Sequence, residues 1–268
     1  MLDREFELTR GQFDRIRHLA KARAGINLSE AKFDLVYSRL TRRLRVLHLP
    51  AFAPYLELLE SGDEEEMREL LNALTTNVTS FFREAYHFDF LAGLRSPPGS
   101  TRPFKVWSSA SSTGEEPYSI AMTLLDAGVR DHRILASDLD TSVLETAKAG
   151  WYRREKTTGI GHERLQRWFV PGRGDRAGWM QVKPELQQRM IFHPINLMQR
   201  WPIRGPVDAI FCRNVLIYFD RPTQSALFRR FANLLAPGGH LFLGHSESLH
   251  DEPRLKAVGR TIYQRVTQ

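Results

Sequence analysis

The chain has 268 residues, of which 42% are hydrophobic and 26% are charged. This length allows two domains, or one larger α/β domain with an extension. No apolar run approaches the ~20 residues that span a bilayer, and the first residues lack the apolar core of a signal peptide. We therefore expect a cytoplasmic protein with no membrane insertion. The single cysteine, Cys212, excludes an internal disulfide and a cysteine-based zinc site.

The net charge of +7 is not spread evenly along the chain. Basic residues concentrate in residues 10–48, whereas acidic residues concentrate in residues 57–69. An excess of positive charge is compatible with a nucleic-acid partner, but here the basic character is concentrated in one early segment.

Residues 1–80 are predicted to form an all-helical domain. Apolar residues recur there at helical spacing, and no strand-like alternation interrupts them; examples are Phe13, Ile16, Leu19, Ala20, Leu40, Leu44 and Leu47. Residues 81–103 are expected to be a linker, because the segment LRSPPGSTRP, residues 94–103, is rich in proline, glycine and serine.

From residue 104 to the end, short apolar strands alternate with amphipathic helices. The expected strands are FKVWSS, RILASD, VDAIFCRN and HLFLGH, and the helices between them include YSIAMTLLDAG, TSVLETAKAG and TQSALFRRFANLL. This alternation predicts an α/β domain built on a doubly wound parallel sheet. The alternation is interrupted over residues 152–194, where glycines separate aromatic and β-branched runs, so we expect a small antiparallel insertion at about 158–192.

The turn WSSASSTGEEPYS after the first of these strands is unusual for a nucleotide-binding fold. A bound phosphate needs several glycines or a lysine, but this turn contains only Gly114, followed by Glu115 and Glu116. Thr113 and Glu116 also have the spacing of a helix capping box, which is a purely structural alternative. Asp138 ends the next strand, at close to the ~20-residue spacing at which an acid binds ribose hydroxyls. A ribose-bearing ligand with a positive end and no phosphate fits both features, and S-adenosylmethionine is such a molecule.

Two further patterns carry little functional weight. The segment GHSES, residues 244–248, departs from the G-x-S-x-G motif of hydrolases at its last position and follows a strand without entering a helix. The histidines at 87, 193 and 245 are far apart in sequence and form no metal-binding pair, so we expect no metal.

Several segments together resemble one family, the chemotaxis receptor glutamate O-methyltransferases, or CheR proteins. The segments are AGINLSEAKFDLVYSRLTRRLR, TNVTSFFREAYHF, WSSASSTGEEPYSIA, ASDLDTSVLETAKAGWY, DAIFCRNVLIYFD and PGGHLFLGHSESL. The resemblance implies an all-α N-terminal domain joined to a Rossmann-like S-adenosylmethionine-dependent methyltransferase domain, residues 104–268, with an inserted antiparallel β-subdomain.

The resemblance also implies the site residues. The cofactor-binding residues would be Asn77, Thr79, Arg83, Glu116, Asp138, Asn196, Leu197, Arg213 and Asn214. Arg83 and Tyr218 would be catalytic, Arg83 by orienting a carboxylate and Tyr218 by lining the transfer site. Structural alternatives exist for several of them: Asn77 and Thr79 can cap turns, Leu197 can be core, and Tyr218 can be a buried tyrosine.

The activity implied is transfer of a methyl group from S-adenosylmethionine to glutamate γ-carboxylates in the cytoplasmic region of chemoreceptors. The products are glutamate methyl esters and S-adenosylhomocysteine. The receptor's helical bundle would dock on a basic helix carrying Arg39, Arg42, Arg43 and Arg45, whose alternative role is a solvated face. Gly172, Gly174 and Gly178 resemble a loop that tethers a receptor C-terminal peptide, although residues 175–177 differ from that pattern. We expect a monomer without a nucleic-acid partner.

Two other functions stay open at this point. A nucleic-acid methyltransferase is suggested by the charge, but the segment CRNVLIYF differs from the D/N-P-P-Y type of segment that grips a base amino group. A non-catalytic module that binds S-adenosylmethionine and a partner is the alternative from a different class.

Overall fold

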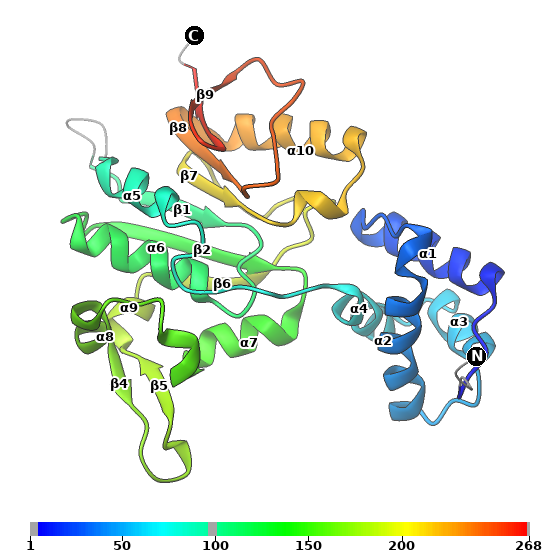
Figure 1. Cartoon of the computed structure of the whole chain (residues 1–268). Coiled ribbons are helices and arrows are strands. Elements are labelled where there is room, and N and C mark those ends of the chain that lie inside the picture. The colour runs from blue at the N-terminus through cyan, green and yellow to red at the C-terminus, as the bar shows by residue number, and fades with distance from the viewer. Residues whose placement is uncertain (1–4, 96–100, 267–268) are drawn as a thin grey trace. The chain divides into compact units, whose positions relative to one another are not determined.

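The computed structural model describes residues 5–95 and 101–266 (Figure 1). The chain divides into two compact units. The first consists of Met1–Thr76 together with Tyr218–Asp220, and the second of Asn77–Ile217 together with Arg221–Gln268.

The first unit is helical and has its own core. Its α-helices are α1 (Arg10–Ala24), α2 (Phe33–Val46), α3 (Phe52–Glu60) and α4 (Glu64–Leu74). Residues at helical spacing on all four helices are completely buried, among them Phe13, Ile16, Leu40, Leu44, Phe52, Tyr55, Leu56 and Leu70. Thr9 begins α1 in a reciprocal capping box with Gln12. The short segment Tyr218–Asp220 joins this unit, since the carbonyl of Tyr218 accepts a hydrogen bond from Asn27 N at 2.8 Å.

The second unit is built on a seven-stranded sheet with the order β6-β2-β1-β7-β8-β10-β9. The five strands at its start are mutually parallel: β6 (Met190–Pro194), β2 (His132–Asp138), β1 (Phe104–Ser108), β7 (Val207–Cys212) and β8 (Leu235–Leu243). Of the last two strands, β10 (Ile262–Arg265) pairs antiparallel with β8, and β9 (Leu255–Gly259) pairs antiparallel with β10. The sheet is therefore parallel in its central part, as the sequence predicts, and mixed at one edge.

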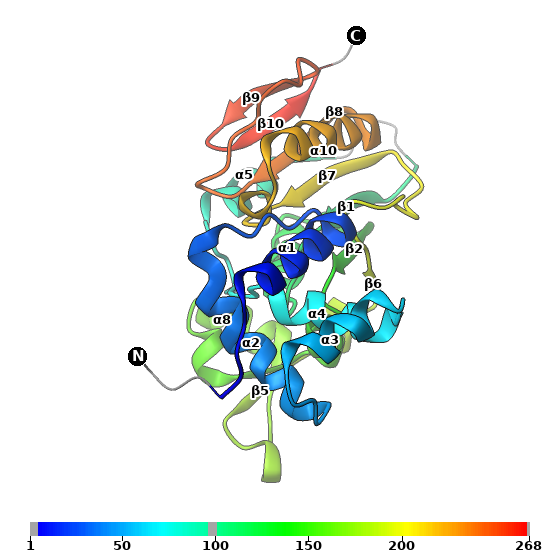
Figure 2. The same cartoon turned by 90° about the vertical axis from the view of Figure 1, so that its right-hand side faces the viewer.

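Helices cover both faces of this sheet (Figure 1). The α-helices are α5 (Tyr86–Gly93), α6 (Glu115–Asp126), α7 (Thr141–Ala149) and α10 (Arg221–Leu234). Successive strand residues point to opposite faces. Val106 accordingly packs in one cluster with Leu91 of α5 and Met122 of α6, whereas the ring of Trp107 lies 5.7 Å from Phe231 of α10. Figure 2 gives the view in which α10 lies along β7 and β8.

A second, three-stranded antiparallel sheet lies in the segment expected to be an insertion. Its order is β3-β5-β4, formed by β3 (Trp151–Arg153), β5 (Trp179–Val182) and β4 (Phe169–Pro171), with the short helices α8 (His162–Trp168) and α9 (Pro184–Gln187) beside it. The sheet starts earlier than the expected position of about 158, because Trp151 pairs with Gln181. The chain returns to the main sheet at β6, where Met190 pairs with Ile134.

The structure also differs from the expected linker. Helix α5 occupies part of residues 81–103, because Phe88 and Leu91, about one turn apart, are both buried against the main sheet. The proline- and glycine-rich core of that linker, residues 96–100, lies outside the described residues. Within the part of the chain that is described, none of the helices is both long and apolar enough to traverse a bilayer.

Candidate active site

The turn between β1 and α6 is shaped by one glycine. Gly114 has φ of 98°, in the left-handed region, and a Cβ placed there would lie 2.7 Å from the hydroxyl of Tyr152 and 2.8 Å from Cβ of Ala147. The capping box considered for Thr113 and Glu116 is not formed. The hydroxyl of Thr113 donates to Glu115 instead, at 2.6 Å, which leaves Glu116 free to turn inward.

Glu116 begins a buried chain of alternating charges. Its Oε1 accepts a hydrogen bond from the hydroxyl of Ser108 at 2.7 Å, and its Oε2 lies 3.3 Å from Nη1 of Arg213 at the end of β7. Nη2 of Arg213 lies 3.3 Å from Oε2 of Glu84 and also donates to the carbonyl of Arg83. Two carboxylates therefore share one guanidinium, and the cluster suits a ligand with a positive charge.

The pKa values of these two carboxyls shift in opposite directions. Burial raises the pKa of Glu116, against the opposing effect of Arg213 and of the hydrogen bond from Ser108. Burial also opposes the ionised form of Glu84, but hydrogen bonds from His245 and the charge of Arg213 outweigh it and lower the pKa of Glu84 to about 2. Glu84 is thus ionised throughout the physiological range.

A second acidic group lies at the end of β2. The carboxylate of Asp138 accepts hydrogen bonds from Ser112 N at 2.8 Å and from Asp140 N at 3.0 Å, and it is 8% exposed. Asn77 lies next to it, since its side-chain amide donates to Asp140 Oδ2 at 2.7 Å and its carbonyl accepts from the hydroxyl of Ser112 at 3.0 Å. Burial raises the pKa of Asp138 to about 6.

The loop after β6 lies beside the same edge of the sheet. Ile195 N donates to the carbonyl of Asp138 at 3.1 Å, which places Asn196 and Leu197 next to the end of β2. The side-chain oxygen of Asn196 accepts from Met198 N at 2.9 Å, and Leu197 is buried. The structure therefore brings Asp138, at the end of β2, close to the loop after β6 that carries Asn196 and Leu197.

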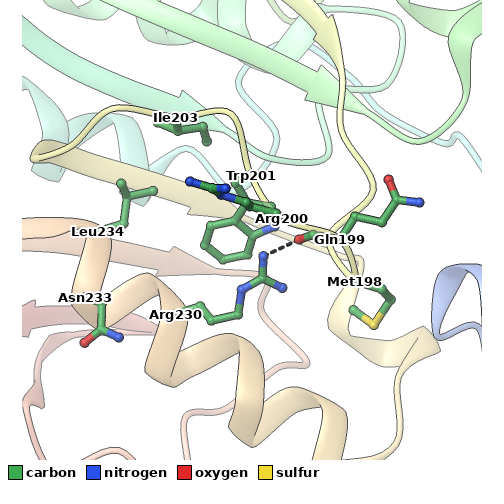
Figure 3. A pocket seen from close by; sticks show the side chains of 8 residues that line it. All are labelled: Met198, Gln199, Arg200, Trp201, Ile203, Arg230, Asn233 and Leu234. Atoms are coloured by element: carbon green, nitrogen blue, oxygen red, sulfur yellow. Dashed lines mark hydrogen bonds between the residues drawn. The ribbon is translucent and has the colours of Figure 1, made fainter.

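This loop is held from outside by Arg230 of α10 (Figure 3). Nη1 of Arg230 donates to the carbonyl of Leu197 at 2.5 Å, and its other terminal nitrogen donates to the carbonyl of Gln199. The guanidinium lies 3.7 Å from the centre of the Trp201 ring, and the indole nitrogen of Trp201 donates to the same carbonyl of Leu197 at 3.2 Å. These groups line a pocket of about 680 Å³, together with Met198, Arg200, Ile203, Asn233 and Leu234.

The loop after β7 carries Arg213 and Asn214. Asn214 has φ of 58°, which is uncommon outside glycine. Its side-chain amide lies 3.4 Å from Oε1 of Glu84, and its main-chain nitrogen donates to Glu247 at 2.9 Å. Arg213 and Asn214, the two predicted site residues of this loop, therefore both contact the carboxylate of Glu84.

The other three predicted site residues are Arg83, Thr79 and Tyr218. Arg83 is half-buried and its Nη1 donates to the carbonyl of Val78 at 2.9 Å, whereas Thr79 is half-buried on the same segment. Tyr218 belongs to the helical unit, so its position relative to the other site residues stays a prediction.

Three of the four arginines predicted for docking have partners within the helical unit. Arg43 binds both oxygens of the buried Glu66, at 2.5 to 2.9 Å, and Arg39 donates to the carbonyl of Thr75 at 2.5 Å. Arg45 pairs with Glu5. Arg42 is exposed and has no recorded partner among residues 5–95 and 101–266.

The glycines predicted to form a tethering loop connect β4 to β5. A Cβ at Gly172 would lie 2.2 Å from the carbonyl oxygen of Arg176, so no larger residue fits there. Gly174 and Gly178 have φ of 57° and 80°, in the region that favours glycine. The loop's conformation therefore requires small residues whether or not it binds a peptide.

Sequence reasoning missed four residues that support this site: Glu84, Arg230, His245 and Glu247. In the sequence, the GHSES segment is part of the family resemblance and an imperfect hydrolase motif, and neither assigns a contact to His245, whose Nδ1 lies 2.8 Å from Glu84 Oε1. The one signal in the sequence for a role of Glu84 is that it directly follows Arg83, a predicted site residue. Nothing in the sequence distinguishes Arg230 from the neighbouring Arg229.

Comparisons with known proteins agree with these features. Residues 77–263 match the family described as CheR methyltransferase, SAM binding domain, and residues 11–75 match CheR methyltransferase, all-alpha domain. The chain is 50% identical over 263 residues to the chemotaxis protein methyltransferase of Klebsiella aerogenes, covering 96% of this chain and 90% of that protein. It is 49% identical over 263 residues to the Escherichia coli K12 protein of the same name, covering 96% and 91%. It is 47% identical over 267 residues to chemotaxis protein methyltransferase 2 of Pseudomonas aeruginosa, covering 97% and 95%.

These matches confirm the expected fold class and confirm S-adenosylmethionine as the cofactor. The residues at the sheet edge fit this molecule. The buried carboxylates of Glu116 and Glu84, which share one arginine, favour a positive ligand over a phosphate, and Asp138 offers acceptors for ribose hydroxyls.

We expect Arg230→Met to weaken the binding of S-adenosylhomocysteine by about tenfold, because two carbonyls of the loop that carries Asn196 and Leu197 lose their charged donor. Isothermal calorimetry of the purified chain measures this change. The matched control is Arg229→Met, which removes an exposed arginine from the same helix and should bind like the wild type. Wild-type affinity in Arg230→Met would contradict the role of Arg230.

The affinity for S-adenosylhomocysteine should rise with pH through about 6. Burial raises the pKa of Asp138 to about 6 in the free protein, and the ionised carboxylate is the better acceptor for ribose hydroxyls. The contribution of Asp138 to binding is therefore present above pH 6 and lost as the pH falls below it. Calorimetric titrations between pH 5 and 7.5 test this. The step should disappear in Asp138→Asn, and an identical step in that variant would assign it to another group.

Proposed function

Because the chain belongs to the CheR methyltransferase family, we propose that it methylates glutamate γ-carboxylates in the cytoplasmic region of chemotaxis receptors. The observation that carries this proposal is the match along almost the whole chain to relatives named chemotaxis protein methyltransferase. The negatively charged, buried edge of the sheet is consistent with it, since the methyl donor is a cation.

The bound cofactor supplies an activated methyl group on a sulfonium. A glutamate is ionised near pH 7, so the acceptor needs no general base. A carboxylate oxygen forms the new bond to the methyl carbon as the bond between carbon and sulfur breaks, and the electron pair of that bond stays on sulfur. The products are a methyl ester and S-adenosylhomocysteine, and no proton is transferred. Positioning therefore has to supply most of the rate.

We assign the binding of the cofactor to the residues that line the sheet edge. Asp138 would accept hydrogen bonds from the ribose, and Glu116 would face the positive end of the molecule. The remaining cofactor contacts are assigned to Asn77, Thr79, Arg83, Asn196, Leu197, Arg213 and Asn214. Arg213 is already bound between two carboxylates, so its part is to hold them rather than to attract an anion.

Arg83 is the proposed group for orienting the substrate carboxylate. Its Nη1 donates to the carbonyl of Val78, and its charge acts on Glu116, but no hydrogen bond or ion pair from its guanidinium to an acidic side chain is recorded among the described residues. The other guanidinium donors are thus available for a two-point contact with a carboxylate. Tyr218 is proposed to line the transfer site.

The receptor is proposed to dock on α2. Arg39 and Arg43 fasten α2 to other parts of the helical unit, so the charge available for an acidic helix is concentrated at Arg42 and, more weakly, at Arg45. A receptor C-terminal peptide is proposed to add to the small sheet at β4, an edge strand next to the glycine loop. We propose a monomer that acts on protein and binds no nucleic acid.

The decisive experiment uses methyl-labelled S-adenosylmethionine and a chemoreceptor cytoplasmic fragment. Label released by alkali as methanol supports carboxyl methylation. Alkali-resistant label would instead favour transfer to nitrogen or to nucleic acid in the preparation, and cofactor binding with no transfer would favour a non-catalytic module. Adding free receptor C-terminal peptide should lower the rate if the tether exists, and an unchanged rate would remove the tether from the proposal.

Arg83→Ala should lower kcat/KM for the receptor fragment by about tenfold or more, since a charge-assisted contact is lost. Its affinity for S-adenosylhomocysteine should fall much less. Arg130→Ala, which removes an exposed arginine elsewhere in the same unit, is the control. Normal turnover with unchanged cofactor affinity in Arg83→Ala would show that Arg83 does not orient the carboxylate.

Arg42→Glu should raise KM for the receptor fragment severalfold and reduce the salt dependence of the reaction, because a cation facing the acidic helix is reversed. Arg68→Glu makes the same charge change on α4 and should leave KM nearly unchanged. Steady-state rates at several salt concentrations provide the measurement. Equal KM values for the two variants would reject docking at Arg42.

A further inference from the structure

Glu247 is a buried carboxylate with an unusual set of partners. It is 6% exposed, and the hydrogen-bond donors recorded against it are all main-chain nitrogens, those of Gly244, Asn214, Val215 and Leu216. Oε2 accepts from Gly244 N at 2.6 Å and from Asn214 N at 2.9 Å, while Oε1 accepts from Leu216 N at 2.8 Å. No arginine or lysine is recorded against it among the described residues, so its partners are the amides of two loops.

These two loops leave adjacent strands of the main sheet. Gly244 follows β8, and Asn214 and Leu216 follow β7, which pairs with β8 in parallel. A single side chain therefore joins the ends of two strands at the edge where the cofactor site is assembled.

The loop after β7 has no regular ladder to fix it. Asn214 adopts φ of 58°, a conformation that costs energy for a residue other than glycine, and the bond from its nitrogen to Glu247 compensates for part of that cost. Gly244 packs closely against the same contact. A Cβ there would lie 2.5 Å from Nδ2 of Asn214 and 2.9 Å from both its main-chain nitrogen and Oε2 of Glu247. The absence of a side chain at Gly244 therefore leaves room for Asn214 and Glu247 to meet.

We infer that Glu247 is a positioning residue for methyl transfer: it fixes the main chain of the loop that carries Arg213 and Asn214 against the cofactor. The inference rests on the proposed roles of Arg213 and Asn214. It gives the GHSES segment a function, since Gly244 leaves room for Asn214 and the carboxylate of Glu247 accepts the hydrogen bonds from the main chain. It also explains why a carboxylate is needed, because an amide would offer only one oxygen to these main-chain donors.

The test is Glu247→Gln in the full chain, with S-adenosylhomocysteine affinity measured by calorimetry well below the Tm. The glutamine has nearly the same shape, but its NH₂ group must face at least one of the main-chain donors. We expect the Kd to rise about tenfold or more, with a similar fall in kcat for methylation. A wild-type Kd together with a wild-type kcat would overturn the inference, even if the Tm falls.

The matched control is Glu252→Gln. Glu252 is 5% exposed in the same unit, but its recorded hydrogen bonds come from Arg254, at 2.7 Å from Nε and 2.7 Å from Nη2. This variant should lower the Tm and leave the Kd unchanged. If both variants raised the Kd equally, the effect of Glu247 would be one of general stability, and the inference would fail.

A second variant keeps the proposal testable if Glu247→Gln does not fold. Gly244→Ala keeps the glutamate but places a methyl group against both Asn214 and Oε2 of Glu247, so it should disturb the same contact and raise the Kd in the same way. An unchanged Kd in Gly244→Ala would contradict the dependence of cofactor binding on this contact. Because the Kd for S-adenosylhomocysteine is measured without receptor, it separates this inference from the proposed function: absence of methyl ester in the wild type overturns only the latter.

Discussion

The methyltransferase unit depends on one buried interaction, the guanidinium of Arg213 between the carboxylates of Glu116 and Glu84. The three residues come from the end of β7, the first turn of α6 and the segment before α5. Removing one partner of such a buried pair leaves an uncompensated charge and typically costs about 3–5 kcal/mol. Two negative charges balanced by one positive charge also leave this edge of the sheet attractive to a cation. The contact that holds these three elements together therefore also gives the sheet edge an excess of acidic groups.

The loops around this centre are held by long-range hydrogen bonds to their main chains. Arg230 of α10 donates to the carbonyls of the loop after β6, and Glu247 accepts from the amides of the loop after β7. Main-chain contacts of this kind fix a loop's path while leaving its side chains available to a ligand. The residues proposed to touch the cofactor thus depend on residues that do not touch it.

Backbone strain is concentrated in the same region. Phe82, Glu84, Ser112 and Asn214 are not glycines, yet their φ values are 54°, 59°, 48° and 58°. Each such residue costs free energy, and strained residues persist where surrounding contacts fix them. Here the fixing contacts are hydrogen bonds to Asp138, Glu247 and the hydroxyl of Ser119. The hydrogen bonds that fix these backbone positions lie within the chain itself, which suits a reaction that depends on positioning.

The sequence by itself determined that a helical domain precedes an α/β domain, and that the ligand carries a ribose and a positive charge. Local spacing is enough for this, because helical and strand periodicity, the turn at Gly114 and the acid at Asp138 are properties of short segments. The sequence also indicated the residues after β6 and β7, through the family resemblance. Only the tertiary structure decided which charges are paired. Arg43 is bound to Glu66, Arg213 lies between two glutamates, and Arg42 is left exposed. Pairing depends on contacts between residues far apart in the chain. No local pattern therefore shows that Arg230 and not Arg229 holds a loop, or that Glu247 within GHSES accepts hydrogen bonds from another loop.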